Sequence, residues 1–122
     1  MTVERRKGIM RIEESRLGEV LVVKPMVSRI DASSAAAFKA MLNERIQEGQ
    51  QRIVLNLSEV DFIDSTGLGA IVSSLKAVGA TGEIAISNPQ ETVMSLFRLT
   101  RMNRVFQILP SEEEAVASLS KS

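Results

Sequence analysis

Residues 52–78 read RIVLNLSEVDFIDSTGLGAIVSSLKAV, and this stretch predicts a strand followed by a helix. The run 52–57 is short and aliphatic, which is typical of a strand buried in the centre of a sheet. From Ser65 to about Val78, apolar side chains recur at helical spacing, and we expect this stripe to pack on the sheet. Its members are Leu68, Ile71, Val72, Leu75 and Val78. The stretch therefore indicates one strand–helix unit of an α/β fold.

Strand and helix patterns continue on both sides of this unit. Strands are predicted at 9–14, 19–27, 83–87 and 104–109, and helices after caps near 31–34, Asn88 and Ser111. This alternation predicts one α/β domain over residues 9–119, with a mixed, mostly parallel sheet of about four to five strands and about four helices. Residues 1–8 and 120–122 are predicted to be flexible tails.

Composition excludes several classes of function. The formal net charge is zero, so the basic footprint of a nucleic-acid-binding protein is missing. No apolar run approaches the roughly 20 residues that span a bilayer, and the N-terminal MTVERRKGIM lacks the apolar stretch of a signal peptide. Without cysteine or histidine, the chain cannot form disulfides, zinc sites of the usual ligand types, or Ser-His-Asp and Cys-His catalytic systems. We expect a cytoplasmic protein with no cofactor, no metal site, no catalytic residue and no direct contact with nucleic acid or membrane.

The glycine-rich STGLG, residues 65–69, superficially suits phosphate binding because it opens the predicted helix. The P-loop pattern requires a lysine directly after the glycines, and none is present here. Ser65 also lacks a general base of the usual kind, because Asp64 is adjacent in the chain and poorly placed to act as one. The residues therefore favour a binding protein over an enzyme.

The face of the predicted helix opposite its apolar stripe carries only small residues. At 100° per residue, this face consists of Thr66, Gly69, Ala70, Ser73 and Ala77. Gly69 inside a helix costs about 1 kcal/mol relative to alanine. Small residues allow another chain to approach closely, so we expect a partner to dock here. Burial under another part of the same chain and formation of a homodimer remain open as alternatives.

Ser65 is predicted to lie at the N-terminal end of this helix, where it could act as the N-cap. A phosphate on its hydroxyl would also be accepted there, because free N–H groups and the helix dipole favour an anion. The phosphate would add a charge of about −1.5 to −2 beside Asp61 and Asp64, with no lysine or arginine close in sequence. Like charges a few ångströms apart repel by roughly 3–4 kcal/mol per unit pair at an effective dielectric near 20. One hydroxyl could therefore switch the binding of a partner.

The segment DFIDSTGLGAIVSSLK, residues 61–76, resembles the signature of the STAS-domain family, and specifically of bacterial anti-sigma factor antagonists. Upstream, SRIDASSAAAFKAML is similar to the family segment that places an aspartate before the first helix. Downstream, ISNPQETVMSLFRLTRMNRVFQILPSEEEAV resembles the closing part of the family. The resemblance covers residues 9–119.

This resemblance implies a partner-switching cycle. The unphosphorylated protein is expected to bind an anti-sigma factor that is also a serine kinase, and so to release a sigma factor. The kinase is expected to phosphorylate Ser65, with Thr66 as the secondary site, and a PP2C-type serine phosphatase to reset it. The residues assigned to partner binding are Asp31, Asp64, Thr66, Gly67, Gly69, Ala70 and Ser73. Within the same family, a signalling scaffold, a secretion regulator or a subunit of a lipid transporter stays open as the alternative.

Two positions depart from the family pattern. Ser28 and Arg101 stand where the family usually has glycine. The first departure leaves the role of Asp31 less secure than that of Ser65. The second predicts that the left-handed residue after the third helix is Asn103, which tolerates that conformation.

Overall fold

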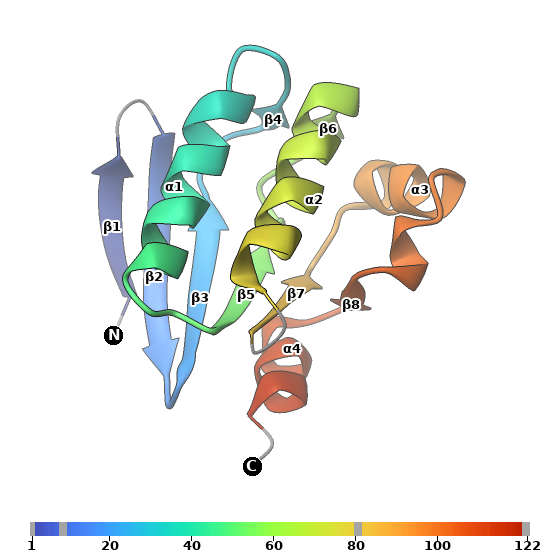
Figure 1. Ribbon diagram of the computed structural model, residues 1–122. Helices are drawn as coiled ribbons and strands as arrows, with labels where there is room; N and C mark the ends of the chain where they lie inside the picture. The colour runs from blue at the N-terminus through green and yellow to red at the C-terminus, as the bar shows by residue number, and fades with distance from the viewer. Residues whose placement is uncertain (1, 8–9, 80–81, 121–122) are drawn as a thin grey trace.

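The computed structural model describes residues 2–7, 10–79 and 82–120 (Figure 1). Among these residues, a six-stranded sheet has the order β1 (Thr2–Lys7), β2 (Met10–Leu17), β3 (Val20–Pro25), β5 (Arg52–Asn56), β7 (Glu83–Ser87) and β8 (Gln107–Leu109). The pairings β1–β2 and β2–β3 are antiparallel, and the other three are parallel. The predicted α/β class and the mixed, mostly parallel sheet are therefore confirmed.

Strand β1 was not expected, and the prediction of a flexible tail is wrong for residues 2–7. The strand pairs with β2 along its whole length, from Thr2 opposite Ser15 to Lys7 opposite Met10. The pairing uses backbone N–H and C=O groups, which the free edge of β2 offers to any chain. The charged sequence of this segment carries no hydrophobic alternation, so its strand was not recognised. Residues 1, 8, 121 and 122, also predicted as tail, lie outside the described residues.

Helices cover both faces of the sheet. In the described part of the chain, the four helices are α1 (Ala35–Gln47), α2 (Ser65–Val78), α3 (Glu91–Leu99) and α4 (Glu112–Leu119). Figure 1 shows α1 and α2 side by side on one face, with α3 beyond them. Helix α4 contacts β3, β5, β7 and β8 from the other face. The predicted number of helices is confirmed.

The central strands contribute alternate side chains to two separate cores. In β5, Ile53 and Leu55 join the core under α1 and α2, whereas Val54 joins the core under α4. This alternation follows from the two-residue period of a strand. Because both faces are covered, β5 is an uninterrupted apolar run, which is why the sequence predicted it well. The α4 core is closed by Ala115 and Leu119.

The observed ends of the helices and strands confirm some of the predicted boundaries and contradict others. Ser111 caps α4 as predicted, since its hydroxyl accepts a hydrogen bond of 3.2 Å from the Glu114 N–H. The N-cap of α3 is Gln90, two residues after Asn88, which was the predicted cap. The left-handed residue after α3 is Arg101, with φ 61°, and the prediction of Asn103 is wrong. A 3₁₀ turn, η1 (Met102–Arg104), includes Arg104, which was predicted to start the last strand, and β8 begins only at Gln107.

Two strands of two residues each form a second, parallel sheet. Strand β4 (Arg29–Ile30) lies just before α1, and β6 (Phe62–Ile63) lies just before α2. Their pairing was not predicted, because two residues are too few to show a period. This small sheet brings together the two loops that lead into α1 and α2.

Candidate functional site

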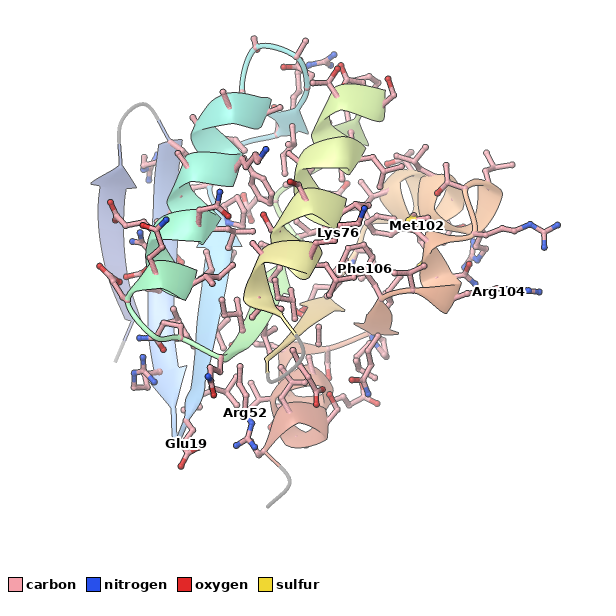
Figure 2. The ribbon with its side chains drawn as sticks, viewed as in Figure 1. Glu19, Arg52, Lys76, Met102, Arg104 and Phe106 are labelled. Carbon is pink, nitrogen blue, oxygen red and sulfur yellow. The ribbon has the colours of Figure 1, made fainter. Side chains whose placement is uncertain are left out.

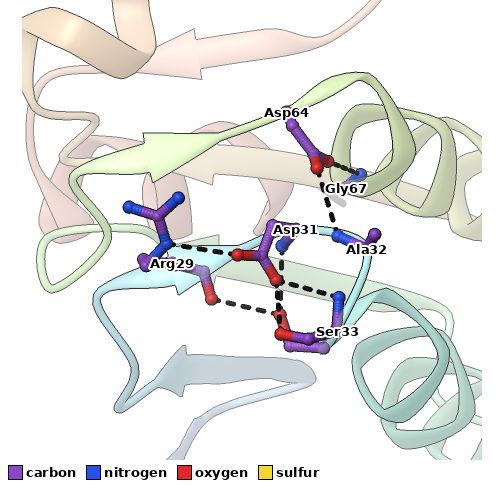
Figure 3. A network of polar contacts seen from close by, with 7 residues as sticks. Arg29, Asp31, Ala32, Ser33, Asp64 and Gly67 are labelled. Carbon is purple, nitrogen blue, oxygen red and sulfur yellow. Dashed lines mark hydrogen bonds and ion pairs between the residues drawn. The ribbon is translucent and has the colours of Figure 1, made fainter.

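The small sheet holds the start of α2 against the start of α1. Arg29 pairs with Phe62 and Ile30 pairs with Ile63, and both isoleucines are buried. The Asp64 N–H donates to the Ile30 carbonyl at 3.3 Å. Residues 31–34 and Asp64, which are 30 positions apart in the chain, therefore lie side by side (Figure 3).

Asp64 is the N-cap of α2, and one carboxylate ties two loops together. Its Oδ1 accepts a hydrogen bond of 2.8 Å from the Gly67 N–H. Its Oδ2 accepts a bond of 3.1 Å from the Ala32 N–H in the loop before α1 (Figure 3). The expectation that Ser65 could cap the helix is therefore wrong, because Asp64 has the extended backbone and the side-chain acceptor of an N-cap.

Ser65 is the first residue of α2, and its side chain is exposed. Within the described residues, its hydroxyl makes no hydrogen bond, and neither its N–H nor that of Thr66 has an acceptor. Free N–H groups are normal in the first turn of a helix and form a site that favours an anion. Because the capping task falls to Asp64, the Ser65 hydroxyl is open to modification without loss of the cap.

Asp31 organises the neighbouring loop. Its Oδ1 accepts hydrogen bonds from the Ser33 hydroxyl at 2.6 Å and from the Ser33 N–H at 3.0 Å. Its Oδ2 accepts a bond of 3.1 Å from the Arg29 guanidinium. The Ser33 hydroxyl first, and Arg29 second, hold the pKa of the Asp31 carboxyl below its usual value of 3.8. Asp31 is therefore ionised and held in place before the N-cap position of α1, which Ser34 occupies without a capping hydrogen bond. The Ser34 hydroxyl instead accepts from the Asp31 N–H at 3.0 Å and donates to the Arg29 carbonyl at 3.2 Å.

Arg29 was not predicted as a site residue, yet it contacts both the loop before α1, through Asp31, and the strand before α2, through Phe62. Its guanidinium carbon is 4.1 Å from the centroid of the Phe62 ring, which is 39% exposed. No lysine or arginine is close to Asp61 and Asp64 in sequence, and the sequence alone does not reveal that the parallel register of β4 and β6 pairs Arg29 with Phe62, which lies between these two acids in the chain. Three aspartates, Asp31, Asp61 and Asp64, still outnumber this one arginine.

The buried face of α2 is turned relative to the predicted stripe. Its buried residues are Gly67, Ala70, Ile71, Ser74 and Val78, and Leu68, Val72 and Leu75 are only half-buried. The reason is that α2 contacts α1 as well as the sheet, and small residues fit between two adjacent helices. Ala70 was predicted on the outer, partner-binding face, and that prediction is wrong because its side chain is buried.

Gly67 is buried too, and the fold itself explains why it is glycine. A Cβ atom at this position would collide with the carbonyl oxygen of Ile30 and lie 2.8 Å from its carbonyl carbon. The glycine therefore permits the close approach of α2 to β4. It does not offer a surface to a partner, as was expected.

Four residues do form an exposed, uncharged strip along α2. Thr66, Gly69 and Ala77 are exposed and Ser73 is half-buried. A Cβ atom on Gly69 would have no atom within 4 Å outside its own helix. Packing within the chain therefore does not require this glycine, although it weakens the helix by about 1 kcal/mol relative to alanine. We call Ser65 and these four residues the α2 surface.

Comparison with known proteins gives a consistent result. The STAS domain family matches residues 11–115. The anti-sigma F factor antagonist of Paenibacillus polymyxa is 30% identical over 114 residues, which cover 92% of this chain and 94% of the relative. Within the described residues, every helix is too short or too polar to cross a bilayer.

Solved structures show the same architecture. A Thermotoga maritima protein, provisionally named an anti-sigma factor antagonist, has a TM-score of 0.81 and 28% identity, covering 88% of this chain and 93% of its own. An anti-sigma factor antagonist from Mycobacterium paratuberculosis has a TM-score of 0.84 at 19% identity, covering 92% and 95%, which shows the shared fold alone. From the sequence signature, the topology and these relatives together, the chain belongs to the STAS-domain family and, within it, to the anti-sigma factor antagonists.

Proposed function

We propose that this protein binds an anti-sigma factor through the α2 surface and that phosphorylation of Ser65 ends this binding. The observation that carries the proposal is the free, exposed hydroxyl of Ser65 at the head of an uncharged helix face. The Paenibacillus polymyxa relative is named for antagonism of an anti-sigma factor, which supports the same kind of partner here. Release of a sigma factor from that partner would be the output.

In this proposal the chain contributes the phosphate acceptor and the partner contributes the catalytic groups. The partner is expected to be a serine kinase, which would transfer the γ-phosphoryl group of ATP to Ser65 Oγ while the hydroxyl proton leaves. A PP2C-type serine phosphatase would hydrolyse the phosphoester and restore the hydroxyl. Thr66, the next exposed hydroxyl, is the secondary acceptor.

Electrostatics explains how the phosphate would act without unfolding the domain. The free N–H groups of the first turn can accept an anion, so α2 keeps its cap and its position. The surface already holds three aspartates against Arg29, whose guanidinium is paired with Asp31. A further charge of about −1.5 to −2 makes this end of α2 strongly acidic. Burying it against a partner without a matching cation would lower the affinity by roughly a hundredfold or more.

The test uses the full chain, the anti-sigma factor from the same organism, and ATP. Intact mass spectrometry is expected to show one added phosphate on the wild type and on the matched control Thr66→Ala, and none on Ser65→Ala. Calorimetry is expected to show tight binding for the wild type and at least roughly hundredfold weaker binding after phosphorylation. Full phosphorylation of Ser65→Ala would move the site elsewhere, and unchanged affinity after phosphorylation would remove the switch.

Affinity purification from native cells separates this role from other STAS roles. Recovery of an anti-sigma factor with kinase activity supports the proposal. Recovery of transporter ATPase subunits or a signalling scaffold, with no kinase or sigma regulator, would assign the α2 surface to a different complex.

A further inference from the structure

The segment 98–105, RLTRMNRV, joins the end of α3 to η1 and concentrates positive charge on a neutral protein. Its three arginines, Arg98, Arg101 and Arg104, are all exposed. Leu99, between Arg98 and Arg101, is 83% exposed, and Val105, directly after Arg104, is 53% exposed, although both are aliphatic. The segment contains no acidic residue. We call these five side chains the α3–η1 patch.

The chain leaves most of this charge without a partner. Arg98 pairs with Glu91, two turns earlier on the same face of α3, at 3.0 Å. Within the described residues, Arg101 and Arg104 form no ion pair and no side-chain hydrogen bond. Figure 2 shows Arg104 extending away from the body of the protein. Two guanidinium groups are therefore available to another molecule.

Arg101 also occupies a backbone position that favours glycine. Its φ is 61° and its ψ is 20°, the left-handed conformation that follows the C-cap of α3. Its N–H donates to the Arg98 carbonyl at 3.2 Å, so Arg101 is tied to the end of the helix. Glycine adopts it at the lowest cost, and a long side chain adopts it rarely. The internal contacts of the fold thus give no reason for arginine at this position.

We propose that the α3–η1 patch is a second docking surface, which binds an acidic protein segment carrying an aliphatic side chain between carboxylates. Exposed aliphatic side chains close to arginines are typical of protein interfaces, in which arginine is enriched. The arginines match carboxylates because the guanidinium binds them in a bidentate manner. Leu99 and Val105 would cover the aliphatic side chain.

Other classes of ligand fit the patch less well. Surfaces that bind single-stranded nucleic acid stack the bases on exposed aromatic rings, whereas the rings of this region, Phe97 and Phe106, are buried. Membrane-surface helices carry a broad apolar face with aromatic anchors, and this patch offers two aliphatic side chains. A protein segment with acidic residues and an apolar residue would pair with the arginines of the patch and also cover Leu99 and Val105.

The patch is separate from the α2 surface. Helix α3 starts beside the phosphorylation site, since the Thr92 hydroxyl donates to the Asp61 carbonyl at 2.9 Å. The arginines lie at and beyond the opposite end of this nine-residue helix, which is about 13 Å long. A phosphate on Ser65 would change the first surface and leave the second in place. A partner held at the patch could therefore stay bound in both states of the switch.

The test is a titration of the full, ¹⁵N-labelled chain with a synthetic peptide in which leucines alternate with pairs of glutamates. Amide shifts are expected at residues 98–105. Arg101→Gly and Arg104→Ala are each expected to weaken binding at least tenfold. Arg16→Ala, an exposed arginine at the far end of β2, is expected to leave it within twofold. Arg101→Gly is expected to unfold at an equal or higher denaturant concentration, because glycine suits the backbone there, so a loss of binding cannot be ascribed to misfolding.

Several results would overturn the proposal. Equal loss of binding in Arg16→Ala would show non-specific attraction, and equal binding of a peptide with serine in place of leucine would remove the apolar contact. Tighter binding of phosphatidylserine vesicles or duplex DNA at residues 98–105 would assign the patch to another class of ligand. Self-association in the ultracentrifuge that disappears in Arg101→Gly would assign it to a second copy of the chain.

Discussion

Neighbouring residues at the start of α2 have different roles, and their contacts within the chain show which role each has. Asp64 caps the helix and holds the loop before α1, whereas the exposed Ser65 side chain makes no hydrogen bond within the described residues. The two glycines that follow differ in the same way. Gly67 lies against Ile30, and Gly69 faces open space. Contacts inside the chain thus distinguish residues needed for the fold from residues available for binding.

At this scale, Gly67→Ala and Gly69→Ala form a matched pair with opposite outcomes. Gly67→Ala forces a methyl group into the Ile30 carbonyl and is expected to lower the free energy of unfolding by about 1–3 kcal/mol or more. Gly69→Ala is expected to raise it by up to about 1 kcal/mol, because alanine is the better helix former. Urea denaturation of the free protein measures both.

Binding gives the second half of this comparison. If the anti-sigma factor packs against Gly69, Gly69→Ala weakens the complex while it stabilises the free chain. Unchanged affinity for Gly69→Ala would show that the partner does not contact this part of the α2 surface.

At the scale of elements, the loop between β4 and α1 is ordered by charge and hydrogen bonds more than by apolar packing. Ala32 and Ser33 are exposed, and the loop is held by Asp31, Ser33, Ser34 and the carboxylate of Asp64. A loop of this kind depends on the ionisation of its acids. Its stability should therefore change with pH.

The pH dependence has a definite sign. The pKa of Asp31 is lowered in the folded protein, so its contribution to stability is fully present above the unfolded pKa of about 3.9 and is lost as the pH falls through the folded value. Ser33→Ala removes the main cause of the shift and is expected to raise the pKa of Asp31 toward its usual value. NMR titration of the Asp31 carboxyl carbon measures this change. Ser73→Ala, a hydroxyl on α2, is the control that should leave it unaltered.

At the scale of the whole molecule, the sheet and its two cores are a rigid support for surfaces at its rim. Helix α4 closes one face and α1 with α2 closes the other, so neither core depends on Ser65. We expect phosphorylation to leave the fold intact. Amide shifts should be confined to residues near 31–34 and 61–69, and the free energy of unfolding should change by no more than about 1 kcal/mol. Shift changes spread through β3, β5 and β7 would instead indicate a conformational switch.

Much of this protein can be predicted from the order of its residues. Alternation and helical spacing depend on local backbone geometry, so the central strands, the four helices and the cap at Ser111 could be predicted. The signature around Ser65 likewise identified the family. Strand β1 was not predicted because backbone pairing requires no particular side-chain pattern and its sequence is charged. Strands β4 and β6 were not predicted because each has only two residues.

The sequence alone determined the α/β class and the family, and it singled out Ser65 as the proposed phosphorylation site, because each of these depends on short-range patterns. Tertiary structure decided which face of α2 is exposed and that Asp64 and not Ser65 caps this helix. It also decided that Arg29 contacts both Asp31 and Phe62, and that Arg101 is left-handed with no side-chain partner among the described residues. The physical reason is that burial and charge pairing depend on which segments meet in space. In this protein the contacts that decide these features join residues some 30 positions apart, as Ala32 and Asp64 are.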